Sequence, residues 1–380
     1  MESNATKQLV WTNILFFGIT SFLAIFVLPV YAIKVGLKPI DWILFAFMAI
    51  STMMATTFGY HRLFAHKAFK AHPVLEFLNL FFGAATFGGS ALGWASEHRD
   101  HHKYTDTPHD PYNIGQGFWH AHMGWFLTWR YQVDFDNVKD LSSNKWVMHQ
   151  HQHYLLWSIG TGIVLPIAVG TAFGSFWGAA LLAVCGRLFF IHQSIFMINS
   201  ACHTFGKPTY DLKASARDSF FNAILTHGEG YHSYHHRFPS DYRNGVRWYH
   251  WDPTKWLIKF YSFFGLCTEL KKIPEAKIIA VRAEVERELM HSKLKASSQA
   301  QALIHNVQEK LEHAYQGMLE SCKQWEQAAL KFKNLKQNNL KLSPEVIQNW
   351  KQQISQLRID ALEARKLWLG IFGQYSRQFA

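Results

Sequence analysis

Nine histidines occur in three short clusters and one single position of this 380-residue chain, and each lies at the edge of a long apolar run. They are His61, His66, His98, His101, His102, His203, His232, His235 and His236. Imidazole suits iron, zinc and copper alike, so the residue type does not identify the metal. Nine imidazoles are more than one ion can use. We therefore predict a two-metal centre built on a membrane scaffold.

Helical spacing groups these side chains. Residues at i, i+3 and i+4 share one helical face, so the three histidines within 98–102 can converge, as can the three within 232–236. His61 and His66 differ, because five residues separate them by about 140° around an α-helix. They can meet at one site only if the helix frays or ends between them.

The composition favours a membrane protein. Aromatic residues make up 16% of the chain and charged residues only 17%, which is unusual for a soluble protein. The net charge of +11 could suggest nucleic acid, but basic residues that flank membrane spans on the cytoplasmic side give the same excess. We therefore expect no nucleic-acid partner. The four cysteines lack C-x-x-C spacing and are expected to be free thiols.

Four stretches predict transmembrane helices, because each is long enough for a bilayer core of about 30 Å. They are residues 8–33, residues 42–60, the first part of 154–186, and the run that ends near 206. The inner end of the fourth stretch carries Asn199 and His203, which share one helical face. Basic residues gather on the side of His61, so we expect an integral, multi-pass protein with a cytosolic catalytic face.

The apolar segment 77–96 is predicted not to cross the membrane. If it crossed, His98 would lie some 30 Å from His61, and their clusters could not share metals. Several glycines also weaken it as a regular span. We expect an interfacial or re-entrant segment, followed by a polar stretch, 103–153, that contributes to a cap at the membrane surface.

The remaining chain completes the expected architecture. Residues 250–270 are short, aromatic and basic, as in a helix that lies on a bilayer. Apolar residues then recur at helical spacing, among them Leu289 and Val307, and Ser343 precedes Pro344 as at a helix start. We predict an all-α integral membrane protein with four transmembrane helices, a cytosolic helical cap holding a di-metal site, and a soluble helical C-terminal tail. The expected domains are 1–272 and 273–380.

The clusters resemble the histidine boxes of the membrane fatty acyl desaturases, specifically the stearoyl-CoA (acyl-CoA delta-9) type. They read H-x-x-x-x-H, H-x-x-H-H and H-x-x-H-H in this order, with N-S-x-x-H before the last box. The similarity runs from about Trp42 to Thr268 and includes Asp110-Pro111 and Gly228-Glu-Gly-Tyr-His232. The tail beyond Lys272 lies outside it.

The resemblance implies roles for individual residues. The nine histidines would bind two irons, and Asn199 would hold one iron through a water. A fatty acyl chain would lie in a kinked, closed tunnel under the metals. Ala49 and Met53 match the positions that close this tunnel in the animal enzymes. Arg130 matches a basic position that contacts the CoA head group in the animal enzymes, but its neighbour Trp129 is not basic here.

The expected activity is an oxidoreductase reaction that introduces a cis double bond, at delta-9, into a saturated fatty acyl chain carried by CoA. Removing hydrogen from an unactivated methylene requires a redox-active metal and O2 as co-substrate, which excludes zinc. The chain has no haem-binding His-Pro-Gly-Gly motif, cysteine cluster or dinucleotide fingerprint. Electrons are therefore expected from a separate ferredoxin, cytochrome b5-like carrier or reductase.

Other functions stay open at this point. An acyl-lipid desaturase or a fatty acyl hydroxylase would carry the same boxes, and a histidine-rich metal transporter would place its ligands midway along spans. Outside the boxes, His192 is expected to be a buried, hydrogen-bonded histidine. Side chains that could support the metal ligands from behind are His109, His120, His122 and His227.

Overall fold

The computed structural model describes residues 8–128, 132–297, 299, 301–338 and 342–379. The chain forms two compact units. Unit 1 contains Met1–Pro208 and Lys213–Lys272, and unit 2 contains Thr209–Leu212 and Ile273–Ala380. The strands of the described residues are two residues long, β1 (Lys70–Ala71) and β2 (Cys267–Thr268), and they pair antiparallel. The predicted all-α class is confirmed.

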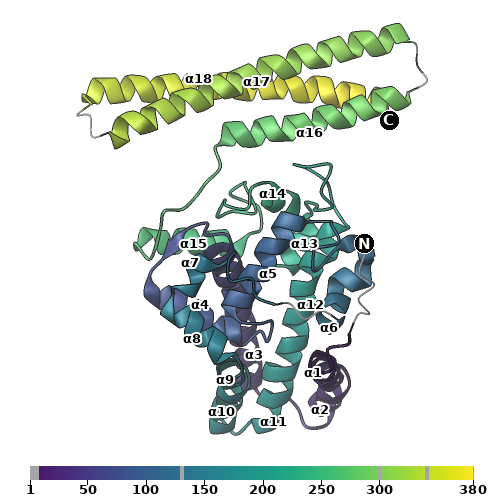
Figure 1. The fold of residues 1–380 in the computed structure, drawn as a ribbon, viewed down its shortest axis with the longest axis vertical. Helices are drawn as coiled ribbons and strands as arrows, with labels where there is room; N and C mark the ends of the chain where they lie inside the picture. Colours follow the sequence, from purple (N-terminus) through teal and green to yellow (C-terminus); the bar gives the residue numbers. More distant parts are fainter. Residues whose placement is uncertain (1–7, 129–131, 298, 300, 339–341, 380) are drawn as a thin grey trace. The chain divides into compact units, whose positions relative to one another are not determined.

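Four helices of unit 1 are long and apolar enough to cross a membrane (Figure 1). The first joins α1 (Trp11–Phe22), η1 (Leu23–Val27) and α2 (Leu28–Lys34), and the second joins α3 (Pro39–Met54) and η2 (Ala55–Ala65). The third joins α9 (Tyr154–Ile159), η5 (Gly160–Val164) and α10 (Leu165–Ala172). The fourth joins α11 (Phe176–Gly178), η6 (Ala179–Gly186), α12 (Arg187–Asn199) and η7 (Ala201–His203). The four predicted spans are confirmed by length and composition.

The two helical hairpins are fastened together at their turns. Lys38, in the first turn, donates from Nζ to the carbonyl oxygen of Gly174, in the second, at 2.6 Å. The buried carboxylate of Asp41 accepts from the backbone N–H of Lys38 at 2.8 Å and lies so close to Gly178 that a Cβ there would meet it at 2.2 Å. Because the two turns lie together at one end of the helices, the opposite ends of the second and fourth long helices, which carry His61 and His203, lie on the same side.

The segment between the hairpins does not span. Its apolar helix, α4 (Pro73–Ala84), has 12 residues, which corresponds to about 18 Å and is shorter than a bilayer core of about 30 Å. The chain then breaks, and α5 (Ala91–Tyr104) begins where the side chain of Ser90 accepts from the backbone N–H of Gly93. The prediction that this segment stays on one side is confirmed by its length. Helix α5 carries the second histidine cluster.

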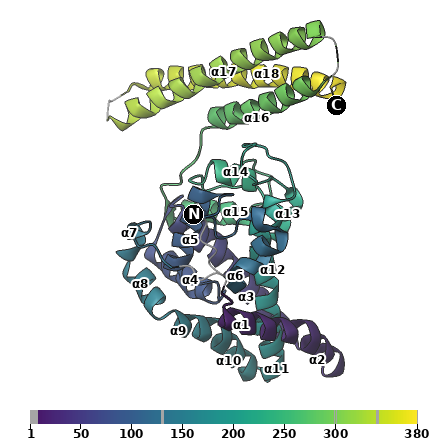
Figure 2. The same cartoon turned by 45° about the vertical axis from the view of Figure 1, so that its right-hand side comes forward.

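Short helices and loops gather at one end of the four long helices, the end at which the second and fourth carry His61 and His203 (Figure 2). They are η3 (Ile114–Gln116), η4 (His120–Gly124), α6 (Trp125–Thr128), α7 (Lys139–Ser142), α8 (Lys145–Gln152), α13 (Phe220–Leu225), α14 (His232–Arg237) and α15 (Pro253–Phe263). Helix α15 buries Ile258 and exposes Phe260 and Phe263, the two faces expected of a helix at a bilayer surface. Its Lys255 is buried instead, where Nζ donates to three backbone carbonyls.

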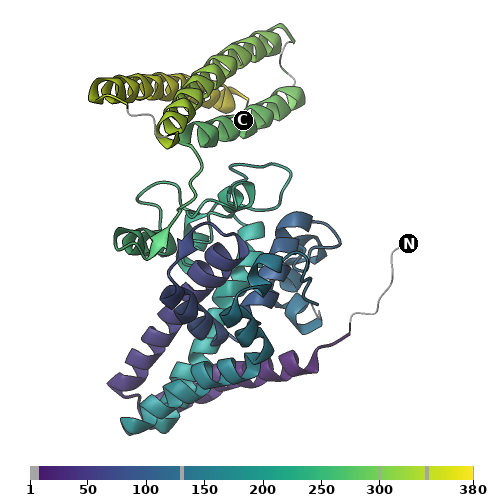
Figure 3. The ribbon, with the colours of Figure 1, turned by 60° about the vertical axis from the view of Figure 1, so that its left-hand side comes forward.

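Unit 2 consists of α16 (Glu275–Ala296), α17 (Gln301–Gln337) and α18 (Pro344–Gln378), shown in Figure 3. A helix start at Ser343 is confirmed, because its side chain accepts from the backbone N–H of Val346. The apolar residues at helical spacing predict helices that are present here; of them, Val307 is buried, whereas Leu289 is 38% exposed. The buried stripe of α16 passes through Ala283, Met290 and Leu294 instead.

Candidate metal centre

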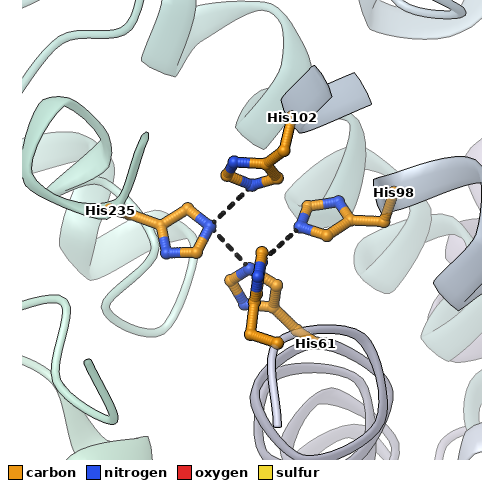
Figure 4. Close-up of side chains that lie close together, drawn as sticks. His61, His98, His102 and His235 are labelled. Carbon is orange, nitrogen blue, oxygen red and sulfur yellow. Dashed lines mark hydrogen bonds between the residues drawn. The ribbon is translucent and has the colours of Figure 1, made fainter. Parts of the chain in front are cut away.

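Five imidazoles meet in the first of two histidine groups. They come from three regions of unit 1, namely η2 with its C-terminal cap, α5 and α14. Their nitrogens lie within 4.8 Å of one another: His61, His66, His98, His102 and His235. Figure 4 shows four of these rings facing a common point. The Nε2 atom of His235 lies 2.9 Å from Nε2 of His61 and 3.0 Å from Nε2 of His102. A further pair, His66 and His98, has Nε2 atoms 2.9 Å apart.

Four imidazoles form the second group, again with nitrogens within 4.8 Å: His101, His203, His232 and His236. Nε2 of His232 lies 3.0 Å from Nε2 of His203 and 3.1 Å from Nε2 of His236. Nε2 of His236 in turn lies 3.3 Å from Nε2 of His101. Both groups draw on α5 and α14. The clusters of His61 and His98, which were predicted to share metals, meet in the first group.

The spacing of these nitrogens suits metal ligation. Imidazole nitrogens bind a metal such as zinc at about 2.1 Å, so two ligands at right angles have nitrogens about 3.0 Å apart. The Nε2 separations are 2.9 to 3.0 Å in the first group and 3.0 to 3.3 Å in the second, which is close to this value. Zinc, iron and copper all accept such ligands, so the geometry indicates metal sites without choosing the element.

Carboxylates behind the rings define which nitrogen faces inward. Nδ1 of His61 lies 3.0 Å from Oε2 of Glu229, and Nδ1 of His101 lies 2.8 Å from Oδ1 of Asp110. An ionised carboxylate only accepts, so each Nδ1 carries the proton and each Nε2 presents a lone pair. Lone pairs aimed at neighbouring Nε2 atoms are the arrangement that a cation stabilises. This donor set therefore fits a resident metal ion.

The electrostatics keep the ligands neutral. Burial, followed by the charges of neighbouring imidazoles, lowers the pKa of His98, His102, His235 and His236 well below the usual value. Burial alone would raise the pKa of Glu229, but His61 and Arg62 outweigh it and bring that pKa to about 2. Neutral imidazoles and an ionised partner are the protonation states that metal binding needs.

A π-helix brings the first histidine pair together. The backbone N–H of His66 donates to the carbonyl oxygen of His61, and η2, an 11-residue π-helix, ends at Ala65. In a π-helix the hydrogen bonds run from i to i+5, so residues five apart stack along the axis. The ring centroids of His61 and His66 lie 4.8 Å apart. The predicted helix end between them is present, but the winding that aligns them was not predicted.

Arg62 ties the second long helix to the loop before α14. Its guanidinium donates to Oε1 of Glu229 at 3.0 Å and to Oδ2 of Asp252 at 3.1 Å. All three side chains are buried. Asn244 donates from Nδ2 to Oε2 of Glu229 at 2.6 Å, the same oxygen that faces His61. Both oxygens of Glu229 are thus hydrogen-bonded. The position of its carboxylate beside His61 is fixed by Arg62 from the second long helix and by Asn244 from the loop after α14.

A largely apolar cavity opens beside the first group. Its lining includes His61 and His98 from this group and the polar side chains of Glu229, Asn199, Tyr60, Thr86 and His192. Its other walls are mostly aromatic and aliphatic, with Trp94 stacked on His98 and two further hydroxyls, Thr56 and Thr57, from the second long helix: Phe17, Phe87, Trp94, Tyr112, Trp125, Phe126, Ile195 and Phe196. A long apolar chain could therefore lie against these walls with part of its length beside the imidazoles.

The other predicted site residues are placed as follows. Asn199 ends α12 and lines the cavity. Ala49 and Met53 are buried in α3, but neither is among the described residues that line the cavity, so a role in closing it stays a prediction. Arg130 and Trp129 fall outside the described residues.

The remaining histidine predictions have mixed outcomes. His192 is buried and its Nε2 lies 2.6 Å from the carbonyl oxygen of Thr86, which confirms a hydrogen-bonded buried histidine. His122 contacts Ser200 and Gln193 on the fourth long helix. Supporting roles for His109, His120, His122 and His227 stay predictions. The side chains that do contact the histidine groups were not singled out.

Two of these partners, Glu229 and Asp110, stand inside motifs that carry the resemblance. An acidic residue within or next to a histidine cluster was the signal that could have found them, since metal-ligating histidines usually donate their second nitrogen to such a group. Ser215, whose hydroxyl contacts His203, lies in a loop without a recognisable pattern.

Comparison with known proteins gives a family for this arrangement. The model of the fatty acid desaturase family matches residues 39–260. The chain is 42% identical over 228 residues to a probable acyl-CoA desaturase of Schizosaccharomyces pombe, which covers 59% of this chain and 48% of the relative. It is 39% identical over 244 residues to acyl-CoA desaturase 1 of Saccharomyces cerevisiae, and this match covers 63% of this chain and 48% of the relative.

A mouse protein, stearoyl-CoA desaturase 4, is 30% identical over 283 residues, which covers 72% of this chain and 78% of the relative. The chain spans about half the length of the two yeast relatives. The matched region includes the histidine-bearing ends of the long helices, α5 and α14, and so contains both groups of the metal centre. The chain belongs to the fatty acid desaturase family.

Proposed function

We propose that this chain is an O2-dependent fatty acyl desaturase that forms a cis double bond, at delta-9, in a saturated acyl chain carried by CoA. Two C–H bonds break and one C=C bond forms. The two hydrogens, two protons and two electrons from a separate donor reduce O2 to two molecules of water. The observation that carries the proposal is the pair of histidine groups, the first of which lines a largely apolar cavity.

Two iron ions are the proposed cofactor. The five-histidine group and the four-histidine group would each hold one iron, and Asn199 would reach an iron through a water. When bound, the irons supply the redox chemistry that O2 reduction and C–H cleavage need, which zinc cannot supply. The histidines hold the ions through Nε2, and Glu229 and Asp110 keep the opposite ring nitrogens protonated.

The cavity walls support the substrate assignment. Phe17, Phe87 and Phe196 present hydrocarbon and aromatic surface and exclude water, as an acyl chain requires. Only the carbons held beside His61 and His98 lie close to the proposed irons, so the position of the double bond depends on how deep the chain enters. The cavity thus selects the reacting carbons by proximity.

The partners and the location complete the proposal. The names of the two yeast relatives and the mouse relative describe CoA-linked acyl substrates, and we propose the same carrier here. Four long apolar helices would place the protein in a bilayer with the catalytic face in the cytosol. The two electrons would come from a ferredoxin, a cytochrome b5-like carrier or a reductase, and an excess of basic residues favours an acidic donor.

The test is expression in a host that lacks its own desaturase, followed by gas chromatography of the fatty acids and iron analysis of the purified protein. We expect cis-9 products and two irons per chain, and neither for His102→Ala. Labelled acyl-CoA and labelled phospholipid, each supplied with a donor, separate the acyl-CoA reaction from acyl-lipid desaturation. Hydroxylated products, or iron without oxidised lipid, would contradict the proposed function.

A further inference from the structure

A chain of hydrogen bonds runs outward from His203 in the four-histidine group. Nδ1 of His203 lies 2.6 Å from Oγ of Ser215. Oγ of Ser215 lies 2.5 Å from Oδ1 of Asp106, and the backbone N–H of Ser215 donates to Oδ2 of Asp106 at 2.7 Å. Both carboxylate oxygens of Asp106 are therefore used by Ser215. The three residues come from different parts of unit 1, namely the end of the fourth long helix and two loops.

The direction of each bond in this chain follows from the donors available. The ionised carboxylate of Asp106 cannot donate, so the hydroxyl hydrogen of Ser215 points to it. Oγ of Ser215 is then left with lone pairs, and it accepts from Nδ1–H of His203. The proton of His203 is thereby assigned to Nδ1. Its Nε2 presents a lone pair toward Nε2 of His232, which lies 3.0 Å away.

The loop that holds Asp106 also orients a second ligand. Asp106 has a φ of 63°, in the left-handed region that aspartate tolerates better than most residues. In this conformation its backbone N–H donates to Oδ2 of Asp110 at 3.0 Å, while its side chain reaches Ser215. Asp110 is the partner of His101. One strained turn therefore positions two of the four histidines, His203 from a long helix and His101 from α5.

We propose that Ser215 and Asp106 are positioning residues that fix the ring orientation and the protonated nitrogen of His203, and so set the iron affinity of the four-histidine group. The inference rests on the proposed function, in which this group holds one of two irons. Outer partners of this kind change metal affinity by about 10-fold to 100-fold in proteins. The five-histidine group has its own partner, Glu229, and is expected to keep its iron when the Ser215 chain is broken.

The first variant is Ser215→Ala in the purified full-length chain. It removes the acceptor of Nδ1–H, so His203 can rotate or carry its proton on Nε2. Titration with an iron chelator is expected to show one of the two irons bound about 10-fold to 100-fold more weakly, with the other unchanged. Ser215→Thr keeps a hydroxyl and should restore both. Ser262→Ala is the matched control, because its exposed hydroxyl donates to the carbonyl of Lys259.

A second variant, Asp106→Asn, separates hydrogen-bond direction from packing. Asparagine has the same shape and also tolerates a positive φ. Its amide oxygen must accept from the backbone N–H of Ser215, which leaves the amide NH2 facing Oγ. The serine hydroxyl then turns toward His203, and the proton of the ring moves to Nε2. We expect the same selective loss of iron affinity as in Ser215→Ala, whereas a packing role would tolerate this change.

The outcomes separate this inference from the proposed function. A wild-type chain that binds no iron overturns the proposed function and this inference with it. Two irons in the wild type, with both held at wild-type affinity in Ser215→Ala and Asp106→Asn, overturn the inference alone. Weak binding in Ser215→Ala with wild-type binding in Asp106→Asn also overturns it, because packing then accounts for the loss. Selective weakening in both variants, with rescue by threonine, supports it.

Discussion

Oε2 of Glu229 lies 3.0 Å from Nδ1 of His61, and its other oxygen, Oε1, accepts from Arg62. Asn244 donates to Oε2 as well. Three donors thus converge on one carboxylate. In Glu229→Gln one oxygen becomes an NH2 group, which must face a donor. We expect iron affinity of the five-histidine group to fall by about 10-fold to 100-fold, measured by chelator titration.

Glu97→Gln is the matched control for that variant. Burial, with the charges of Asp100 and Asp110, raises the pKa of Glu97 to about 8, so this side chain is already neutral at pH 7. A neutral amide of the same shape should leave iron content unchanged. Equal iron affinity in the two glutamine variants would contradict the role given to Glu229.

The metal-depleted protein should lose stability at acid pH. The pKa values of His98, His102, His235 and His236 are lowered in the folded state, first by burial. In the unfolded chain they titrate near about 6.5. Below that pH the unfolded state binds more protons, so the free energy of unfolding falls as pH falls. The loss is up to about 1.4 kcal/mol per imidazole for each pH unit.

Thermal unfolding between about pH 7.5 and about pH 5.5 checks this sign. We expect the Tm of the metal-depleted protein to be constant above about pH 7 and to drop steadily below about pH 6.5. His149→Gln, at an exposed position, should leave that pH dependence unchanged. A Tm that stays flat, or that rises toward acid, is the result that would refute the prediction.

The depth of the cavity offers a prediction about chain length. Thr56 and Thr57 line the cavity, and the hydroxyl of Thr57 donates to the carbonyl oxygen of Met53, one turn further from the histidines. Met53→Ala should extend the available space and shift the product profile toward longer acyl chains. Met48→Ala removes an equally buried methionine that lies about 140° around the helix. Each truncation is expected to cost about 2–5 kcal/mol of stability.

Product analysis across saturated substrates of increasing length distinguishes the two methionines. A preferred length that changes in Met53→Ala and not in Met48→Ala supports the role of Met53. An unchanged preference in both, with activity retained, assigns Met53 to ordinary helix packing.

Unit 2 contains a buried ion pair whose loss should be costly. Glu286 accepts from Arg365 at 2.6 and 2.7 Å and from Nε1 of Trp368 at 2.7 Å. Glu286→Ala leaves the guanidinium of Arg365 buried without its partner, a change that costs about 3–5 kcal/mol. Glu312→Ala removes an exposed partner of Arg287 and should cost at most about 1 kcal/mol. Hydrogen exchange of the full chain, followed by mass spectrometry of peptides from α16 and α18, measures both.

The sequence was sufficient for the histidine clusters and the four spans, because both follow from local properties. Ligand spacing at i, i+3 and i+4 and an uninterrupted apolar run are visible within a few turns of helix. The parity of the spans then placed His61 and His203 at one end, as the joined turns at Lys38 and Gly174 show.

The parts that were missed depend on long-range contacts. Nothing in the spacing links Glu229 to His61 or Ser215 to His203, since each pair meets only when separate segments pack. The exposure of Leu289 on α16 also depends on such contacts. The face of α16 that packs inward carries Glu286, and a buried charge is acceptable there only because Arg365 arrives from α18.

The π-helical turn between His61 and His66 has a consequence for variation in this protein. Substitutions within Arg62–Ala65 leave the number of intervening residues intact, so both rings can still meet. An inserted or deleted residue between them changes the rotation about the helix axis and moves one imidazole to another face of the helix. The number of residues between the two histidines is therefore a constraint of its own, separate from the burial of the side chains in this stretch.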